Sequence, residues 1–285
     1  MPEGHTLHRL ATEIEVTFGR RRVRVESPQG RFAESAALLD GALLRGAEAV
    51  GKHLLVEFSG RRWVHVHLGL IGGFVVTRGP APPPVGVVRL RLRHKRAYAD
   101  LRGPTTCQLI GPGERESLLA RLGPDPLSDD ADPEQAWRRI TRSTAPIAVL
   151  LMRQDVLAGV GNVYRAELLF RHGLEPHTPG RLLGHDRWQA MWGDLVALMR
   201  EGVRTGQIDT VHTAHTPEAM ARAPRVDDHG GEVYVYRRSG QPCHVCETPV
   251  RTEILAGRNL FWCPTCQRPE PQSDRTTDCA DAVDR

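Results

Sequence analysis

Two cysteine pairs near the end of the sequence constrain the fold of this chain more than any other feature. Each pair has the form Cys-x2-Cys, and sixteen residues separate Cys243 and Cys246 from Cys263 and Cys266. Each spacing fits a tight turn that aims two thiolates at one point, and four thiolates complete a tetrahedral zinc site. A disulfide framework is the weaker alternative, because the chain carries no secretion signal. The sequence therefore predicts one structural Zn²⁺ ion with no open coordination position.

The residues around these cysteines, 234–268, are predicted to form a small zinc ribbon. We expect two short β-hairpins here, with the metal replacing the hydrophobic core that so few residues cannot build. Arg258 stands at a glycine-led turn tip, where it suits either a phosphate contact or an ordinary solvated position. Such ribbons serve many functions, so the module by itself predicts a scaffold and no reaction.

Residues 2–112 have the pattern of a β domain that opens with a helix. Leu7, Leu10, Ala11 and Ile14 fall on one helical face. Short segments rich in β-branched and aromatic residues follow, punctuated by Gly or Pro, at 23–27, 53–58, 62–68, 73–77 and 87–93. This spacing is typical of a sandwich or a barrel, and we predict a β-sandwich.

Helical patterns replace the strands between residues 113 and 233. Helices are expected within 114–123, 132–143, 146–154, 161–173 and 184–206. The second of these has an N-cap signature at Asp132, directly before Pro133. Residues 207–233 are polar without a clear period and are predicted to be a loop. The fold class is therefore α+β and multidomain.

The charge of the chain is unevenly distributed. The formal net charge is +4, made up of −3 over residues 269–285 and +7 over the rest. The acidic tail is predicted to be disordered. A basic body suits nucleic acid, although ordinary surface charge explains it equally well. No apolar run approaches the ~20 residues of a membrane helix and no secretory signal is present, so we expect a soluble cytoplasmic protein without a membrane partner.

Lysine is almost absent from this sequence. Of the 38 basic residues, 36 are arginine, and the two lysines are Lys52 and Lys95. Arginine cannot lose its proton near neutral pH, whereas lysine can. A chain so biased towards arginine keeps a lysine by accident or where a deprotonatable amine matters. Lys52 is therefore a candidate functional residue, with a surface hairpin lysine as the alternative.

The sequence begins Met1-Pro2-Glu3-Gly4, and removal of Met1 would expose the secondary amine of Pro2. Such an amine forms a positively charged iminium with an aldehyde-like carbon, and the iminium acidifies the neighbouring C–H bond enough for elimination. The adjacent carboxyl group of Glu3 could act as acid or base. By itself this start is a weak signal, because many proteins begin Met-Pro.

A series of motifs gives this start its meaning. The following motifs occur in this order along the chain: MPEG at 1–4, GKHL at 51–54, HLGLIG at 67–72, DLRGPT at 100–105, RLGPDPL at 121–127, AGVGNVYRAELLF at 158–170 and the ribbon with GRNLFWCPTCQ. The series closely resembles the formamidopyrimidine-DNA glycosylase/endonuclease VIII family, and within it the endonuclease VIII-like branch of actinobacterial type. The resemblance covers about residues 2–268.

The resemblance implies a division into domains and four catalytic roles. It implies a catalytic β-sandwich over 2–112, a helix–two-turn–helix DNA-binding domain over 113–233 and a zinc finger over 234–268, followed by the tail. Pro2 would be the Schiff-base nucleophile, and Glu3 the carboxylic acid that assists base loss and sugar-ring opening. Lys52 would donate a proton during β-elimination. Arg258 would assist δ-elimination and hold a phosphate.

The resemblance also implies contacts to DNA. His67 and Asn162 would join Lys52 and Arg258 around the backbone at the lesion, and Arg121 would be a further contact. Each has a plainer alternative: a core or strand-face histidine, a helix N-cap and a helix-surface charge. Because a base inside a duplex must be flipped out for Pro2 to reach its sugar, something must fill the gap. Leu70 and Ile71 are the candidates for that wedge, with plain core as the alternative for Leu70.

The sequence departs from typical family members at several positions. His5-Thr6 stands where typical bacterial members have a glutamate at the sixth position, and Gly69 where endonuclease VIII has a DNA-contacting glutamine. Residues 207–233 lack the pattern with which the 8-oxoguanine-type branch covers its flipped base. These differences favour oxidised pyrimidines over oxidised purines as substrates.

The leading hypothesis is a monomeric, bifunctional DNA glycosylase and AP lyase of base excision repair, acting on damaged double-stranded DNA near the bacterial nucleoid. One alternative keeps the lyase activity with little base removal. The other is a non-catalytic zinc protein that binds damaged DNA. Pro2, Glu3 and Lys52 argue against the latter, because binding alone would not require them.

Overall fold

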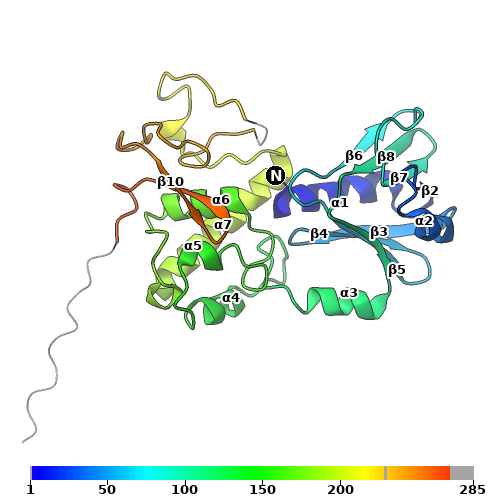
Figure 1. Cartoon of the computed structure of the whole chain (residues 1–285), viewed down its shortest axis with the longest axis horizontal. Coiled ribbons are helices and arrows are strands. Elements are labelled where there is room, and N and C mark those ends of the chain that lie inside the picture. Colours follow the sequence, from blue (N-terminus) through cyan, green and yellow to red (C-terminus); the bar gives the residue numbers. More distant parts are fainter. Residues whose placement is uncertain (1, 228–229, 270–285) are drawn as a thin grey trace, which may run out of the picture.

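The computed structural model describes residues 2–227 and 230–269, and the predicted acidic tail falls, from residue 270 onward, outside them. The chain folds into two lobes joined near the N-terminus, with a β lobe and a helical lobe that carries a small β-hairpin (Figure 1). The β lobe begins with the predicted helix α1, and its elements are α1 (Gly4–Phe18), β1 (Arg21–Arg22), β2 (Arg24–Glu26), α2 (Ala33–Leu39), β3 (Leu43–Val50), β4 (His53–Phe58), β5 (Arg62–His67), β6 (Gly73–Arg78), β7 (Leu90–His94), β8 (Ala97–Arg102) and β9 (Thr106–Ile110).

Two antiparallel sheets form the β lobe, so the predicted β-sandwich is confirmed. One sheet has the strand order β1-β3-β4-β5-β9 and the other β2-β7-β8-β6. The shared core contains Leu7, Leu10 and Ile14 of α1 together with the inward-facing residues of both sheets. Alternate residues of β4 and β5 point the other way, so the five-stranded sheet has a second face with its own small apolar cluster under Leu118.

Four strands of this sandwich, β1, β3, β8 and β9, were not predicted from the sequence. Strand β3 has the sequence LLRGAEAV, in which Gly, Ala and Glu are poor strand formers. Its pairing with β4 from Val50↔His53 to Leu44↔Phe58 supplies the stabilisation that the local sequence lacks.

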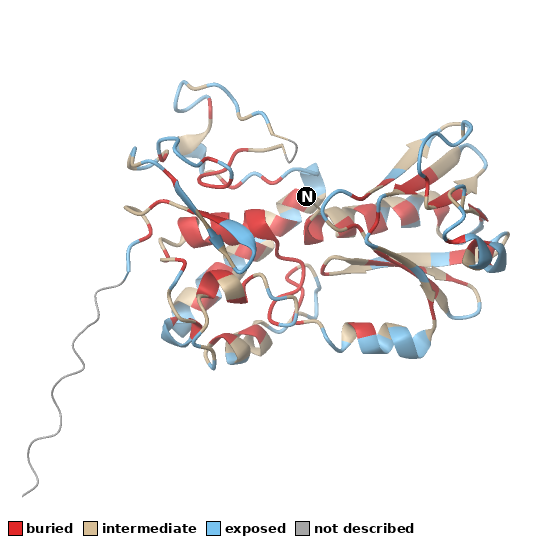
Figure 2. Cartoon of the chain, in the orientation of Figure 1, coloured by how far each residue is buried: buried red, intermediate tan, exposed pale blue. Residues whose placement is uncertain are grey.

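The helical lobe follows the expected order of helices. Helix α3 (Pro112–Leu119) lies against the five-stranded sheet of the β lobe (Figure 1). The helical lobe contains α4 (Pro133–Ile140), α5 (Ile147–Leu150), α6 (Asn162–Arg171), η1 (Gly180–Leu182), α7 (His185–Thr205) and η2 (Thr213–His215). The Asp132 carboxylate accepts the Glu134 N–H, which confirms the predicted N-cap. Helix α5 is shorter than expected, because the chain turns at Gln154, whose side-chain amide bonds to the backbone of Met152, Gly159 and Val160. Helix α6 is almost wholly buried in the lobe (Figure 2).

The ribbon contains one β-hairpin and not the two predicted. Strands β10 (Arg251–Leu255) and β11 (Arg258–Trp262) pair over five positions. The first cysteine pair lies in a turn closed by a single bridge between Pro242 and Pro249. Proline has no N–H to donate, so a ladder cannot extend through these two residues. Across the described residues, no helix combines the length and the apolar character needed to cross a bilayer.

Candidate active site

Three glycines bring three distant segments into contact where the two lobes meet. The Gly4 N–H donates to the Gly159 carbonyl over 2.8 Å. A Cβ on Gly4 would lie 2.9 Å from Gly159 Cα, and a Cβ on Gly51 would lie 3.0 Å from the Gly159 nitrogen. Gly51 and Gly159 also have φ values of 59° and 88°, which glycine adopts without strain. This crossing places the segments that carry Glu3, Lys52 and Asn162 side by side.

The carboxylate of Glu3 is buried at the N-terminus of α6. Its side chain is fully buried, and its two oxygens accept the Gly161 N–H at 2.8 Å and the Val163 N–H at 2.9 Å. These are unpaired N–H groups of the first helical turn, which favour an anionic partner. A Cβ on Gly161 would lie 2.3 Å from Glu3 Cδ, so only glycine permits this approach. The side chain next to Pro2 is therefore held in one position.

Lys52 lies in the turn between β3 and β4 and is not a freely solvated hairpin lysine. Burial lowers its pKa, the Glu3 carboxylate opposes that shift, and the Arg258 guanidinium adds to it. The charges of Glu3 and Arg258 thus act on the same amine. The structure brings together three of the four predicted catalytic residues around this turn.

Asp125 holds the Lys52 turn in place. Its carboxylate, in the connection between the lobes, accepts the Gly51 N–H at 2.6 Å, bonds to His8 Nε2 at 2.8 Å and accepts the Leu127 N–H at 2.9 Å. His8 belongs to α1, so Asp125 links the helix that follows Glu3 to the lysine turn. Asp125 lies within the RLGPDPL motif at 121–127, but its role as an acceptor was not predicted from the sequence.

Pro2 is half-buried and lines a pocket of about 280 Å³ between α1 and the segment before β6. Thr6 and Arg9 of α1 line one part, and Leu68 and Gly72 line another. The pocket is thus open beside the predicted nucleophile and includes the position where typical family members have a glutamate.

Leu70 and Ile71 protrude from the turn that leaves this pocket. Their side chains are 55% and 92% exposed, so the alternative that Leu70 is a core residue is wrong. The turn is rigid at its base: the Gly72 N–H bonds to the Leu68 carbonyl, and a Cβ on Gly72 would lie 2.9 Å from the Gly103 carbonyl oxygen. Two adjacent exposed aliphatic side chains on a fixed turn have the shape of a wedge.

Asn162 is the first residue of α6, but it is not the N-cap, because Gly161 occupies that position. Its side-chain Nδ2 instead donates to the Asn259 carbonyl at 2.9 Å. Arg165, one turn later and 1% exposed, donates to the same carbonyl at 2.9 Å and to Asn162 Oδ1. Helix α6 therefore holds the hairpin at the residue after Arg258, whose own side chain is exposed. The sequence analysis did not single out Arg165, and an arginine on an apolar helix face was the available signal.

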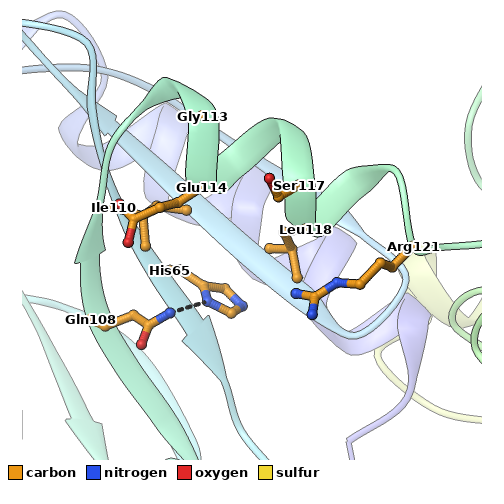
Figure 3. Close-up of a pocket in the computed structure, with 8 residues that line it drawn as sticks. All are labelled: His65, Gln108, Ile110, Gly113, Glu114, Ser117, Leu118 and Arg121. Carbon is orange, nitrogen blue, oxygen red and sulfur yellow. Dashed lines mark hydrogen bonds between the residues drawn. The ribbon is translucent and has the colours of Figure 1, made fainter.

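His67 and Arg121 lie on the outer face of the five-stranded sheet. His67 Nδ1 accepts the Gly69 N–H at 3.1 Å, which leaves Nε2 available. Arg121 follows α3, is exposed, and points across a pocket of about 400 Å³ towards His65 (Figure 3). Neither residue is a core residue, and both lie close enough to His53 to lower its pKa, as Lys52 also does.

The four cysteines of the ribbon fit a zinc ion. Their Sγ atoms all lie within 4.8 Å of one another, with separations of 3.8 Å for Cys243–Cys266 and 3.4 Å for Cys246–Cys263. A tetrahedron with Zn–S bonds of about 2.3 Å has S–S edges of about 3.8 Å. Backbone N–H groups also point at the sulfur atoms of Cys243 and Cys263. The ribbon is therefore a closed, structural site for one Zn²⁺.

Three family models match the chain, and they agree with the three units of the fold. Residues 1–107 match the formamidopyrimidine-DNA glycosylase N-terminal domain, residues 122–214 match the formamidopyrimidine-DNA glycosylase H2TH domain, and residues 240–269 match the zinc finger found in FPG and IleRS. The fold and the site thus define a zinc-containing DNA glycosylase of DNA repair.

Individual relatives narrow this class. The chain is 52% identical over 274 residues to "Endonuclease 8 1" of Mycobacterium tuberculosis, which covers 94% of this chain and 100% of that protein. It is 30% identical over 283 residues to the formamidopyrimidine-DNA glycosylase of Parasynechococcus marenigrum, covering 94% and 99%. The solved structure of the MutM (FPG) protein of Thermus thermophilus superposes with a TM-score of 0.73 at 27% identity, covering 95% and 100%. A Lactococcus lactis FPG structure with Fapy-dG-containing DNA shares the fold, with a TM-score of 0.77 at 20% identity over 94% and 100% of the two chains. The chain belongs to the formamidopyrimidine-DNA glycosylase/endonuclease VIII family.

Proposed function

We propose that this chain is a bifunctional DNA glycosylase and AP lyase that removes oxidised pyrimidines from double-stranded DNA, with the amine of Pro2 as its nucleophile. One observation carries the proposal: Glu3, Lys52 and the contact between Asn162 and the hairpin that bears Arg258 come from distant parts of the sequence and converge beside Pro2. A protein that only binds DNA has no need for a fixed carboxylate and a lysine of lowered pKa beside a secondary amine. The domain boundaries at 112, 233 and 268 and the action as a monomer are part of the same proposal.

The chemistry proceeds in four steps. The Pro2 nitrogen bonds to C1′ of the damaged nucleotide while the bond from C1′ to the base breaks and the base leaves with a proton. The C1′–O4′ bond then opens, assisted by Glu3, and leaves an iminium at C1′. A water molecule takes the C2′ proton as the C3′–O bond breaks, and Lys52 donates a proton to the departing 3′ phosphate. Loss of a proton from C4′ and departure of the 5′ phosphate complete δ-elimination, with Arg258 beside the phosphate.

The flipped nucleotide is proposed to place its base towards the 280 Å³ pocket that Pro2 lines. Leu70 and Ile71 would fill the space that the base leaves in the duplex. Thr6 lines this pocket with a small neutral side chain, which leaves room for an uncharged base. His67, Asn162 and Arg121 would hold phosphates around the kinked strand.

Borohydride trapping tests this function with zinc-loaded protein and duplexes that contain thymine glycol, 8-oxoguanine or an abasic site. We expect a covalent adduct with the thymine-glycol and abasic duplexes and little with 8-oxoguanine. An adduct with the abasic duplex alone would indicate a lyase without base removal. No adduct with any duplex, combined with tight binding, would indicate a damage-binding protein and would overturn the proposal.

Lys52→Arg is expected to slow the elimination step by about 10²–10³-fold, because arginine cannot give up its proton near neutral pH. The pKa of Lys52 is lowered from 10.5, and a proton donor must be charged. The elimination rate of the unmodified protein should therefore fall as the pH rises through a value below 10.5. This fall of the elimination rate at alkaline pH should be absent in Lys52→Arg. Single-turnover cleavage of an abasic duplex between pH 6 and pH 10.5 measures both, with Lys95→Arg as the control.

Gly161→Ala is expected to slow base removal by about 100-fold, because the new methyl group displaces the Glu3 carboxylate from α6 and small displacements of a catalytic group have effects of that size. Single-turnover excision of thymine glycol measures it. Gly113→Ala is the matched control, since a Cβ there meets nothing within 4 Å. An unchanged excision rate in Gly161→Ala would show that the fixed position of Glu3 is not required.

A further inference from the structure

Three histidines form a connected row on the outer face of the five-stranded sheet, next to Lys52. His53 Nδ1 and His65 Nε2 are 2.9 Å apart, and the ring centroids of His53 and His67 are 5.1 Å apart. The strand register accounts for this row: Leu54 pairs with Val66, so His53 faces His67, and His65 pairs with Gln108 of β9. Neither the family match nor the roles proposed above give a function to His53, His65 or Gln108.

With the Gln108 amide oriented as it is, the contacts in this row indicate which nitrogen of each neutral imidazole carries the proton. The Gln108 side-chain Nε2 can only donate, and it lies 3.4 Å from His65 Nδ1. The proton of neutral His65 is then on Nε2, which donates to His53 Nδ1. Neutral His53 therefore carries its proton on Nε2, for which the described residues supply no acceptor. His67 reaches the same state separately, because its Nδ1 accepts the Gly69 N–H.

The surroundings of the row keep it uncharged. Burial is the main reason that the pKa of His53 falls to about 3 and that of His65 to about 4, and neighbouring histidines and Arg121 add to both shifts. Burial and then the charge of Lys52 lower the pKa of His67. One acidic side chain lines the same pocket, Glu114, and its carboxylate accepts the Gly111 N–H at the other end of α3 from Arg121 (Figure 3).

We propose that His53 is a neutral hydrogen-bond donor to a DNA phosphate, beside the cationic donors Lys52 and Arg121, and that His65 and Gln108 are positioning residues that hold its proton on Nε2. A further cation here would be repelled by Lys52 and Arg121. A neutral N–H instead adds a directed hydrogen bond without adding charge. The inference rests on the proposed function, because it assumes that DNA lies across this face.

The salt dependence of binding separates a neutral donor from a charged one. The affinity for DNA falls with salt with a slope of roughly 0.9 per phosphate neutralised by a cation. His53→Phe should weaken binding to a duplex with a tetrahydrofuran abasic analogue by roughly tenfold, the loss expected for one hydrogen bond to a charged group, and leave the slope unchanged. Arg121→Gln should lower both the affinity and the slope, the latter by about one unit. His53→Gln, whose amide nitrogen can take the place of Nε2–H, should restore most of the affinity.

Histidine NMR tests the positioning role directly. In ¹⁵N-labelled protein, the ring nitrogens of His53 should show a protonated Nε2 and an unprotonated Nδ1 at pH 7. His65→Phe should disturb that pattern without loss of zinc or change in the far-ultraviolet spectrum. His94→Phe, on the other sheet, is the control and should bind the duplex normally.

Three results would overturn the assignment. The first is unchanged affinity in His53→Phe, and the second is a proton on Nδ1 of His53 in the folded protein. A fall in salt slope in His53→Phe would also contradict it, because the ring would then act as a cation. Borohydride trapping distinguishes a failure of the proposed catalysis from a failure of this inference. If the unmodified protein forms no adduct, the proposed catalysis is wrong, while the binding measurements still test the role of His53.

Discussion

A variant with one extra residue between Met1 and Pro2 should form no covalent adduct with an abasic duplex. The inserted residue turns the Pro2 nitrogen into a tertiary amide, which has no free electron pair for attack at C1′. The new terminal amine lies one residue before Pro2, and thus further from the Glu3 carboxylate that Gly161 and Val163 hold in place. Because nucleophile and acid act as a unit, we expect the rate of strand cleavage to fall by at least about 10⁴-fold.

The measurement is borohydride trapping combined with mass spectrometry of the N-terminus, so that processing is verified in each preparation. Binding to a tetrahydrofuran duplex should stay within a few-fold of the unmodified protein, because Lys52, Arg121, Asn162 and Arg258 are untouched. Pro80→Ala, in the proline-rich loop of the β lobe, serves as a control for proline substitution. Full trapping by the extended variant would show that another amine is the nucleophile, and Lys52 would be the first to examine.

Replacement of Cys263 by serine should unfold the ribbon and abolish strand cleavage. A bound zinc ion contributes on the order of 10–16 kcal/mol to the folding of such a module. Cys263 is fully buried, and its Sγ lies 3.4 Å from that of Cys246. With the hairpin unfolded, Arg258 leaves the site, and Asn162 and Arg165 lose the Asn259 carbonyl to which both donate. We expect zinc content near zero and a loss of DNA affinity of more than about 100-fold.

Cys107→Ala is the control for this experiment, since Cys107 lies on β9, away from the ribbon. It should retain zinc and activity. Thermal unfolding followed by circular dichroism should show that the β lobe of Cys263→Ser still melts cooperatively. Normal cleavage by a zinc-free Cys263→Ser protein would mean that Arg258 and the hairpin have no part in catalysis.

The sequence predicted the parts of the site better than the contacts between them. The cysteine spacing, the bias against lysine and the motif around Asn162 pointed to residues that the structure does bring together. The glycines at 4, 51, 159 and 161 could not be interpreted in the same way, because the reason for each is a neighbour more than 100 residues away in sequence. The same holds for Asp125, whose acceptor role depends on how α1 and the Lys52 turn approach it.

The errors in the fold have a common physical origin. Strand β3 and the Cys243–Cys246 turn were misjudged because pairing across strands and proline geometry, more than local propensity, determine their conformation. The histidine row was also invisible in sequence. Its members are spread over β4 and β5, and only the strand register places their rings next to one another.

The contacts of α6 have a consequence for the order in which the protein matures. Helix α6 receives Glu3 from the first residues of the chain and the Asn259 carbonyl from the last part. At roughly 5–20 residues per second, ribosomes release the ribbon at least about 10 s after the N-terminal segment. Until α6 has been translated, residues 2–4 cannot be enclosed against it. Under the proposed function, a peptidase would therefore act on Met1 before that point, and strand cleavage would begin only after the ribbon has folded.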